Sequence, residues 1–509
     1  MRSSEARLER VTRRLPTVLT TTALLVASAL FCAEAVHSLD TGDRALIGAC
    51  AAALTGALLL LLSYERLAVL AIGLIPVAIP FGYNVAKALK LSGYTTYMLS
   101  LTTSQVLLAA TLLALIIVTR SRADHAGITM PPWPVTAYAL LGFIPLIWSF
   151  AFILGLSGIL AVWSAWTLEI VLLNLPWHTV KRCLLIFAGT TVIGVLVAIV
   201  GFVNKLGPLA GIYAKVYRSS TITESGMPLT PLQQAFLTPT QIASLGHRLN
   251  FNTNHPNAYA AFLLLACILG LTGIALSRQS RRRKVILMAA YLVVVLTGLV
   301  LTLSRTGAVA MAVSLLCLGA LLFRNPRLRR ILLACVLVGL VIAAIAPFLL
   351  NPSSNNTLVR RFATLSQASQ DASFQVRMQL FRKLVPLLAH HPLGMGYGIF
   401  YDPALPRNLG LDFENAVNNG HDVHLDIAIE SGIPSLLAYV AIWVLAAQQA
   451  LRLYRGEGDA QLVGAFTLAG IAGLLTLGLT NAKPIEDPTP MLAMFMLFVL
   501  PYCARRELG

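Results

Sequence analysis

Apolar runs of about 20 residues, the length a helix needs to cross a bilayer, recur along the whole chain and alternate with polar segments. The pattern predicts an all-α, polytopic bundle of about 12–14 transmembrane helices. A join without charge between two of the runs, near Gly155–Gly158, leaves room for a kink or a re-entrant segment there. The predicted spans are 15–36, 44–63, 67–86, 97–118, 133–152, 157–175, 184–204, 258–276, 285–303, 306–323, 331–350, 433–451, 461–480 and 489–503.

Two polar stretches, 204–257 and 351–432, are too long to be simple connections, and such loops usually carry function. The second is partly helical by its pattern. Its apolar residues recur at helical spacing and predict an amphipathic helix on the membrane surface, which Pro386 bends. They are Val376, Leu380, Phe381, Leu384, Leu387 and Leu388. The expected organisation is therefore an N-terminal bundle (1–203), a first loop (204–257), central helices (258–350), a large loop (351–432) and C-terminal helices (433–509).

Composition supports a membrane protein and excludes a soluble one. Hydrophobic residues make up 57% of the chain and charged residues 12%, whereas soluble domains carry about 25% charged residues. The net charge of +17 does not indicate nucleic acid, because the cations cluster in short loops between apolar runs. The seven cysteines lie in or beside apolar runs without a CxxC spacing, so we expect neither a disulfide framework nor a metal site.

Loop charge predicts the orientation in the membrane. Basic residues occupy alternate short loops, most clearly Arg278 and Arg281–Lys284, then Arg324–Arg330, and also both chain ends. Cytoplasmic loops are the ones enriched in Lys and Arg. We therefore expect both termini in the cytoplasm and both long loops on the outer face.

Two arginines on that outer face are candidates for binding an anion. Arg305 lies where two predicted spans meet almost without a loop, and Arg377 shares a side of the surface helix with Leu380 and Phe381. Guanidinium groups bind phosphate in bidentate fashion. The alternatives are a boundary arginine that extends to the interface for Arg305, and a structural ion pair with a carboxylate such as Asp371 for Arg377.

The segment His421–Ile433 reads as the start of the next helix. Helical spacing puts His421 on one face with Leu425 and Ala428, and His424 one turn away. A neutral imidazole is a natural general base for a hydroxyl nucleophile. A capping or surface histidine is the plain alternative, and a metal pair of His421 and His424 is a second one, for which the sequence offers no third ligand.

These motifs together resemble the O-antigen ligase and polymerase superfamily. The resemblance rests on four pieces in the family's order within about 248–445. They are Arg248-Leu-Asn-Phe with Asn254-His-Pro-Asn257, Ser304-Arg305, Arg377 followed by Pro392-Leu-Gly-Met-Gly-Tyr-Gly398, and His421-Asp-x-x-Leu425 with Glu430-x-Gly-Ile433. Asp422 departs from the family's usual asparagine, and an adjacent carboxylate would raise the basicity of His421 or alter the substrate class.

The resemblance implies an inverting membrane glycosyltransferase of the bacterial inner membrane. It would move a glycan from an undecaprenyl-diphosphate carrier to a lipid or glycan acceptor hydroxyl on the periplasmic face, without a cofactor or metal. Arg305 and Arg377 would bind the diphosphate and His421 would act as general base, with Arg248, Asp422 and Glu430 in support.

Three alternatives stay open at this point. A repeat-unit polymerase and a protein O-oligosaccharyltransferase would use the same donor as the ligase. A transporter or flippase is a different class, which usually places ionisable groups inside the membrane; Glu169 is the clearest such residue in the predicted spans.

Overall fold

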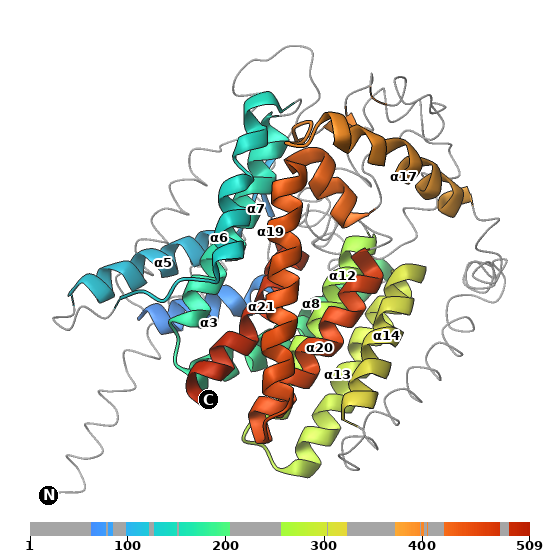
Figure 1. Cartoon of the computed structure of the whole chain (residues 1–509). Coiled ribbons are helices and arrows are strands. Elements are labelled where there is room, and N and C mark those ends of the chain that lie inside the picture. Colours follow the sequence, from blue (N-terminus) through green and yellow to red (C-terminus); the bar gives the residue numbers. More distant parts are fainter. Residues whose placement is uncertain are drawn as a thin grey trace, which may run out of the picture.

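Figure 1 presents the computed structural model of the chain, in which helices form a bundle with one helix laid across its end. The structure describes residues 63–77, 80–84, 98–121, 127–149, 152–203, 256–302, 304–322, 372–397, 399–401, 405, 422–478 and 488–508. The predicted spans 15–36, 44–63 (but for its last residue) and 331–350 lie outside these residues, as does the first long loop except for residues 256 and 257, which begin α12.

The described elements follow one another along the chain as helices, apart from one pair of strands. The N-terminal part contains α3 (Tyr64–Gly73), η1 (Ile75–Val77), β1 (Pro80–Asn84), β2 (Met98–Thr102), α5 (Thr103–Ser121), α6 (Trp133–Leu141), η2 (Ile144–Trp148), α7 (Phe152–Leu173) and α8 (Trp177–Val203). The remainder contains α12 (Pro256–Leu276), α13 (Arg281–Leu301), α14 (Arg305–Leu321), α17 (Ala372–His390), η5 (Ile399–Tyr401), α19 (Val423–Tyr454), α20 (Gly458–Gly478) and α21 (Pro488–Leu508).

The predicted all-α, polytopic class is confirmed. Five of the described helices are long and apolar enough to cross a membrane, namely α8, α12, α13, α19 and α20. Shorter apolar helices lie over 104–119, 133–148, 158–173 and 305–321. The two strands pair antiparallel, with Pro80 opposite Thr102 and Asn84 opposite Met98.

Three predicted spans are interrupted, and prolines explain two of the breaks. The run 67–86 ends as a helix at Gly73 and passes through η1 into β1, because Pro76 and Pro80 lack the N–H that a helix interior requires. The run 97–118 begins as β2 before α5. The run 133–152 breaks after Leu141, where η2 contains Pro145, so the kink lies before Gly155 rather than at Gly155–Gly158.

Helix α12 is the centre of the bundle. Its most apolar window is completely buried inside the protein, and α8, α13, α14, α20 and α21 all pack on it. Small residues permit the close approach. A Cβ on Gly273 would lie 2.7 Å from the Leu184 backbone of α8, and the Tyr291 hydroxyl donates to the Ala266 carbonyl at 2.6 Å. Such contacts drive helix association in lipid, where apolar burial alone does not.

Basic residues gather at one end of the bundle. Lys181 pairs with Asp459 at 3.2 Å, Arg505 donates to Gln449, and the Tyr454 hydroxyl donates to the Leu321 carbonyl at 2.8 Å. These contacts join the ends of α8, α14, α19, α20 and α21 that the loop charges assign to a single side of the membrane.

Helix α19 consists of two arms. Gly432 between them has φ 86° and ψ 167°, and Pro434 follows. Figure 1 shows the short first arm, Val423–Ser431, folded back beside the long second arm. The folding back brings the His424 ring to 5.9 Å from the ring of Tyr439 on the second arm. Residues at the start of α19 therefore lie next to the bundle rather than beyond its end.

Candidate active site

Helix α20 brings the starts of α14 and α19 to the same end of the bundle. The Ser314 hydroxyl donates to the Ala469 carbonyl at 2.6 Å, and a Cβ on Gly473 would lie 3.0 Å from the Ala310 carbonyl. Residue numbers rise along α20 as they fall along α14, so the two helices are antiparallel.

The same helix continues to the start of α19. A Cβ on Gly478 would lie 3.0 Å from Val423 and 3.5 Å from the His424 ring. Gly478 is one and a half turns beyond Gly473, and Arg305 is equally far before Ala310. Arg305 and the Asp422–His424 segment therefore lie at one level, close to the C-terminal end of α20.

Arg305 is the first residue of α14, as its position between two spans predicts. The preceding residue, Ser304, is buried and caps the helix, because its hydroxyl accepts the Gly307 N–H at 3.2 Å. Arg305 itself is partly exposed. A helix N-terminus presents free N–H groups and a partial positive charge. The guanidinium and the helix end together favour an anion at this point.

Asp422 is the N-cap of α19. Its Oδ1 accepts the N–H groups of His424 and Leu425 at 2.8 and 3.0 Å, and lies 3.5 Å from the His424 Nδ1. Partial burial acts to raise the pKa of Asp422, but these hydrogen bonds outweigh it and hold the pKa below its ordinary value. The carboxylate is thus ionised at neutral pH.

The Asp422 carboxylate is paired with His424, a partner that the sequence does not single out. The His424 ring is further held by Tyr439 and by Trp443, whose centroid is 6.3 Å away. Helix α19 begins at Val423, and Asp422 is extended, with φ −137°. The predicted helical face of His421, Leu425 and Ala428 stays a prediction, because His421 lies outside the described residues.

Several predicted site residues lie outside what the structure describes. These are His421, Arg248 and Asp371. Arg377 belongs to α17, but its side chain is outside the description. Among the described residues no three metal-ligating side chains cluster, and the alternative His421–His424 metal pair stays untested because His421 is not among them.

The amphipathic helix α17 is confirmed and packs on the first arm of α19. Leu380 and Leu384 are buried against Leu425 and Ile429, together with Ile399. Phe381 is an exception to the predicted apolar side, because it is 49% exposed. It lies a quarter turn from Leu380, on a face that also exposes Met378 and Val385. Arg377 is thus carried by an element that rests directly on the His424 arm.

The predicted glycine turn, His391–Gly398, joins α17 to the kink of α19. The Met395 and Gly396 N–H groups donate to the Ile429 and Glu430 carbonyls at 2.6 and 3.2 Å. The Ile433 N–H donates to the Pro392 carbonyl at 2.9 Å. In these contacts Glu430, a predicted supporting residue, acts through its main chain.

Sequence reasoning missed the part that the N-terminal bundle plays in this turn. The Trp148 indole N–H donates to the Gly394 carbonyl at 3.2 Å, and the Ser149 hydroxyl donates to the Tyr397 carbonyl at 2.7 Å. The only signal for these residues in the sequence is their place after Pro145 at the break of a predicted span.

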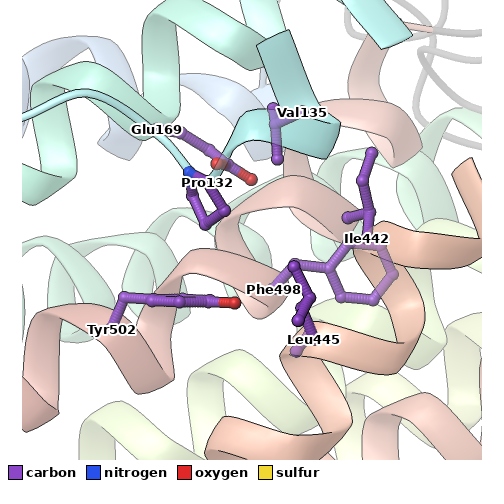
Figure 2. A pocket seen from close by; sticks show the side chains of 8 residues that line it. Pro132, Val135, Glu169, Ile442, Leu445, Phe498 and Tyr502 are labelled. Carbon is purple, nitrogen blue, oxygen red and sulfur yellow. The ribbon is translucent and has the colours of Figure 1, made fainter. Parts of the chain in front are cut away.

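A separate cavity surrounds Glu169 of α7. It has a volume of only about 10 Å³ and is lined by Pro132, Val135, Glu169, Ile442, Leu445, Ala446, Phe498 and Tyr502. Figure 2 shows the Glu169 carboxyl beside Pro132 and Val135, with Tyr502 across the cavity. It is smaller than the roughly 300–1,000 Å³ of ligand pockets. It also lies toward the basic end of the bundle, where Tyr502 is close to Arg505, and not at the end with Arg305.

Comparison with known proteins supports the resemblance to the O-antigen ligase superfamily. No curated protein matches the chain. A family model described as O-antigen ligase matches residues 290–440. This segment begins in α13 and ends in the second arm of α19, so it contains Arg305, Arg377, the glycine turn and Asp422. The chain is a multi-pass membrane protein whose residues 290–440 belong to the O-antigen ligase superfamily of membrane glycosyltransferases.

Proposed function

We propose that the protein transfers a glycan from an undecaprenyl-diphosphate carrier to an acceptor hydroxyl on the periplasmic face of the bacterial inner membrane. The observation that carries the proposal is the common level of Arg305 and the Asp422–His424 segment within the O-antigen ligase domain. A cation beside a helix N-terminus suits the diphosphate, and a histidine segment suits the hydroxyl.

The proposed reaction is a single displacement with inversion. The acceptor oxygen forms a bond to the anomeric carbon as the bond from that carbon to the diphosphate oxygen breaks. The hydroxyl proton passes to His421, and undecaprenyl diphosphate leaves with its negative charge facing Arg305 and Arg377. Fixed guanidiniums beside the low-dielectric bilayer stabilise that developing charge. The reaction needs no nucleotide sugar.

Both termini are cytoplasmic in this proposal, and the donor enters from the outer leaflet. The basic ends of the helices lie opposite Arg305 and Asp422, which agrees with the enrichment of Lys and Arg in cytoplasmic loops. Arg248 and Glu430 support the site in this scheme, and the ionised Asp422 contributes negative charge next to the histidines.

Alanine at His421 tests the general base. We expect His421→Ala to reduce glycan transfer by about 10²–10⁴-fold, the range for a general base, at unchanged expression. The matched control is His178→Ala, because His178 is an exposed histidine at the start of α8, toward the opposite end of the bundle. Transfer retained in His421→Ala would refute the assignment of this residue.

The arginine clamp is tested by exchange at constant charge. Arg305→Lys keeps the cation but loses the planar fork, so we expect partial activity, with Arg305→Ala lower than Arg305→Lys. Arg282→Ala, an exposed arginine at the start of α13, is the control. Equal activity of Arg305→Ala and the unsubstituted protein would exclude Arg305 from the diphosphate site.

Gene deletion separates the ligase from its alternatives. Long free polymer on the carrier is the result expected for a ligase, and single repeat units would indicate a polymerase instead. Loss of glycan from a protein would indicate a protein O-oligosaccharyltransferase. Accumulation of the lipid-linked donor on the cytoplasmic side would indicate a flippase.

A further inference from the structure

The turn His391–Gly398 is clamped between two parts of the chain that are far apart in sequence. On one side it meets the kink of α19. Gly394 and Gly432 both have φ near 86°, and a Cβ on Gly394 would lie 2.6 Å from the Glu430 carbonyl. No side chain fits between these backbones, so the turn and the kink contact each other directly.

On the other side the turn meets the segment that follows η2. Trp148 donates its indole N–H to Gly394, and Ser149 donates its hydroxyl to Tyr397. Gly396 lies between these two bonds with φ 92°, and its Cβ would lie 2.7 Å from the Trp148 carbonyl. Two side-chain hydrogen bonds and one close backbone contact therefore hold three residues of the turn, Gly394, Gly396 and Tyr397.

Tyr397 extends the contact into the N-terminal bundle. Its ring covers Gly155 of α7, where a Cβ would lie 2.8 Å from the Tyr397 Cβ, and its hydroxyl lies 3.2 Å from the Cβ position of Gly142. Burial raises the pKa of the Tyr397 phenol; the nearby Glu430 charge raises it further, and a hydrogen bond with Ser431 opposes both. The uncharged Tyr397 side chain therefore packs between the turn and the N-terminal bundle.

We propose that Trp148 and Ser149 are positioning residues of the transferase. They fix the turn, and the turn sets α17 and the first arm of α19 relative to each other. The role rests on the proposed function, since α17 carries Arg377 and the first arm follows Asp422. Both residues lie outside the matched segment 290–440, so the N-terminal bundle supplies part of the frame of the site.

The effect of losing the clamp follows from the sensitivity of reactions to geometry. A displacement of about 1 Å remote from the reacting atoms can reduce the rate by about 10²-fold. Trp148 and Ser149 do not touch the substrate in this proposal. Their loss therefore lowers kcat through the displaced site and not through a lost substrate contact.

Trp148→Phe and Ser149→Ala test the proposal, because each removes one donor, and the matched controls lose the same volume. The chain offers matched controls. Trp163 donates its indole N–H to the Ala139 carbonyl at the same 3.2 Å, and Ser164 donates to Leu160 at 2.6 Å. We expect Trp148→Phe and Ser149→Ala each to lower kcat by about 10-fold or more, and Trp163→Phe and Ser164→Ala to lower it by less than about 2-fold.

Amide hydrogen exchange of residues 391–398 gives a readout that does not depend on turnover. Exchange should accelerate in Trp148→Phe and Ser149→Ala and not in the controls. Unchanged kcat and unchanged exchange in the two variants would overturn the proposal. A kcat loss equal to that of the controls would also overturn it, since it would reflect general destabilisation.

The two proposals fail in different ways. Absence of glycan transfer by the unsubstituted protein would overturn the proposed function. Transfer by the unsubstituted protein together with full kcat in the double variant Trp148→Phe/Ser149→Ala would overturn only the positioning role. Rescue of the exchange rate by Ser149→Thr, which restores a hydroxyl, would support the hydrogen bond as the cause.

Discussion

Asp422 does two things with one oxygen atom. Its Oδ1 caps the first arm of α19 and also faces the His424 ring. The O-antigen ligase superfamily, which the motifs resemble, usually has asparagine at this position. Asparagine caps a helix about as well as aspartate but carries no charge. The substitution of the family residue therefore changes the electrostatics of the histidine segment and leaves the helix start unaltered.

Because Asp422 both caps the helix and carries a charge, two variants of this residue should have different effects. Asp422→Ala removes the cap and should destabilise the protein by about 1 kcal/mol, whereas Asp422→Asn keeps the cap and should lose only the contribution of the charge. The folded pKa of Asp422 lies below its unfolded value near 3.9. The carboxylate thus stabilises the fold above about pH 4, and this contribution is lost as the pH falls through the folded pKa.

Apparent melting temperatures in detergent at pH 7 and below pH 4 measure both effects. At neutral pH, Asp422→Asn should melt at a higher temperature than Asp422→Ala and at a lower one than the unsubstituted protein. The melting temperature of Asp422→Asn should also depend less on pH. Equal destabilisation by alanine and asparagine would contradict the capping role.

Glu169 is a buried carboxyl that the proposed function does not use. It is 1% exposed in an apolar helix, where an ionised carboxylate without a partner costs several kcal/mol. The uncharged form suits this site, so Glu169→Gln should leave the apparent melting temperature and the transfer activity close to those of the unsubstituted protein. A loss of many degrees in Glu169→Gln would show instead that a charge is required there.

At the residue scale, the sequence predicts candidate site residues but not the side chains that they contact. The arginine at the start of α14 and the carboxylate at the start of α19 follow from chain order and from resemblance. The Asp422–His424 pair does not, because it depends on where the helix begins. If the cap were residue 421 instead of 422, each following side chain would be rotated about the helix axis by the angle of one residue. The sequence pattern does not define helix ends to one residue.

At the scale of elements, the fold-back of α19 is the feature that shapes the site. The sequence gives its cause in Gly432 and Pro434, but a helix that begins near 421 reads equally well as continuous. The kink is required by the close contact with Leu393, because only a glycine with positive φ allows this contact.

Gly432→Ala tests this contact, and Gly458, which also has a positive φ but no close contact, is the control. A Cβ at Gly432 would lie 2.5 Å from the Leu393 backbone, whereas Gly458, with φ 63°, has nothing within 4 Å. Gly458→Ala should cost only the left-handed backbone strain of about 1–2 kcal/mol. Gly432→Ala should cost clearly more and should reduce glycan transfer. Equal melting temperatures of the two variants would contradict the close packing of turn and kink.

At the scale of the whole molecule, the sequence predicts where the spans lie but not which spans pack against each other. Runs of apolar residues locate α12, α13 and α20 within a few residues of the observed helices, whereas α8 begins seven residues before its predicted start at 184. Which helix becomes central is set by small residues such as Gly270 and Gly273, whose contacts are made with distant parts of the chain. For the same reason the sequence does not predict the roles of Trp148 and Ser149, because they contact residues about 250 positions away.

The orientation has a direct test. A fluorescent protein that matures only in the cytoplasm, fused after Gly509, should fluoresce, because the basic ends of the helices are expected to face the cytoplasm. A fusion partner active only in the periplasm should be inactive at the same position. The reverse pattern would place Arg305 and Asp422 on the cytoplasmic side and would exclude the proposed donor leaflet.

The central position of α12 has a consequence for how the protein is made. A nascent segment enters the bilayer according to its own hydrophobicity, and α12 is among the most apolar helices of the chain. In the finished protein the same surface faces other helices. Of the helices that enclose it, α13, α14, α20 and α21 are synthesised later. Its apolar side chains therefore serve lipid exposure during biogenesis, and polar substitutions there should impair insertion before they impair packing.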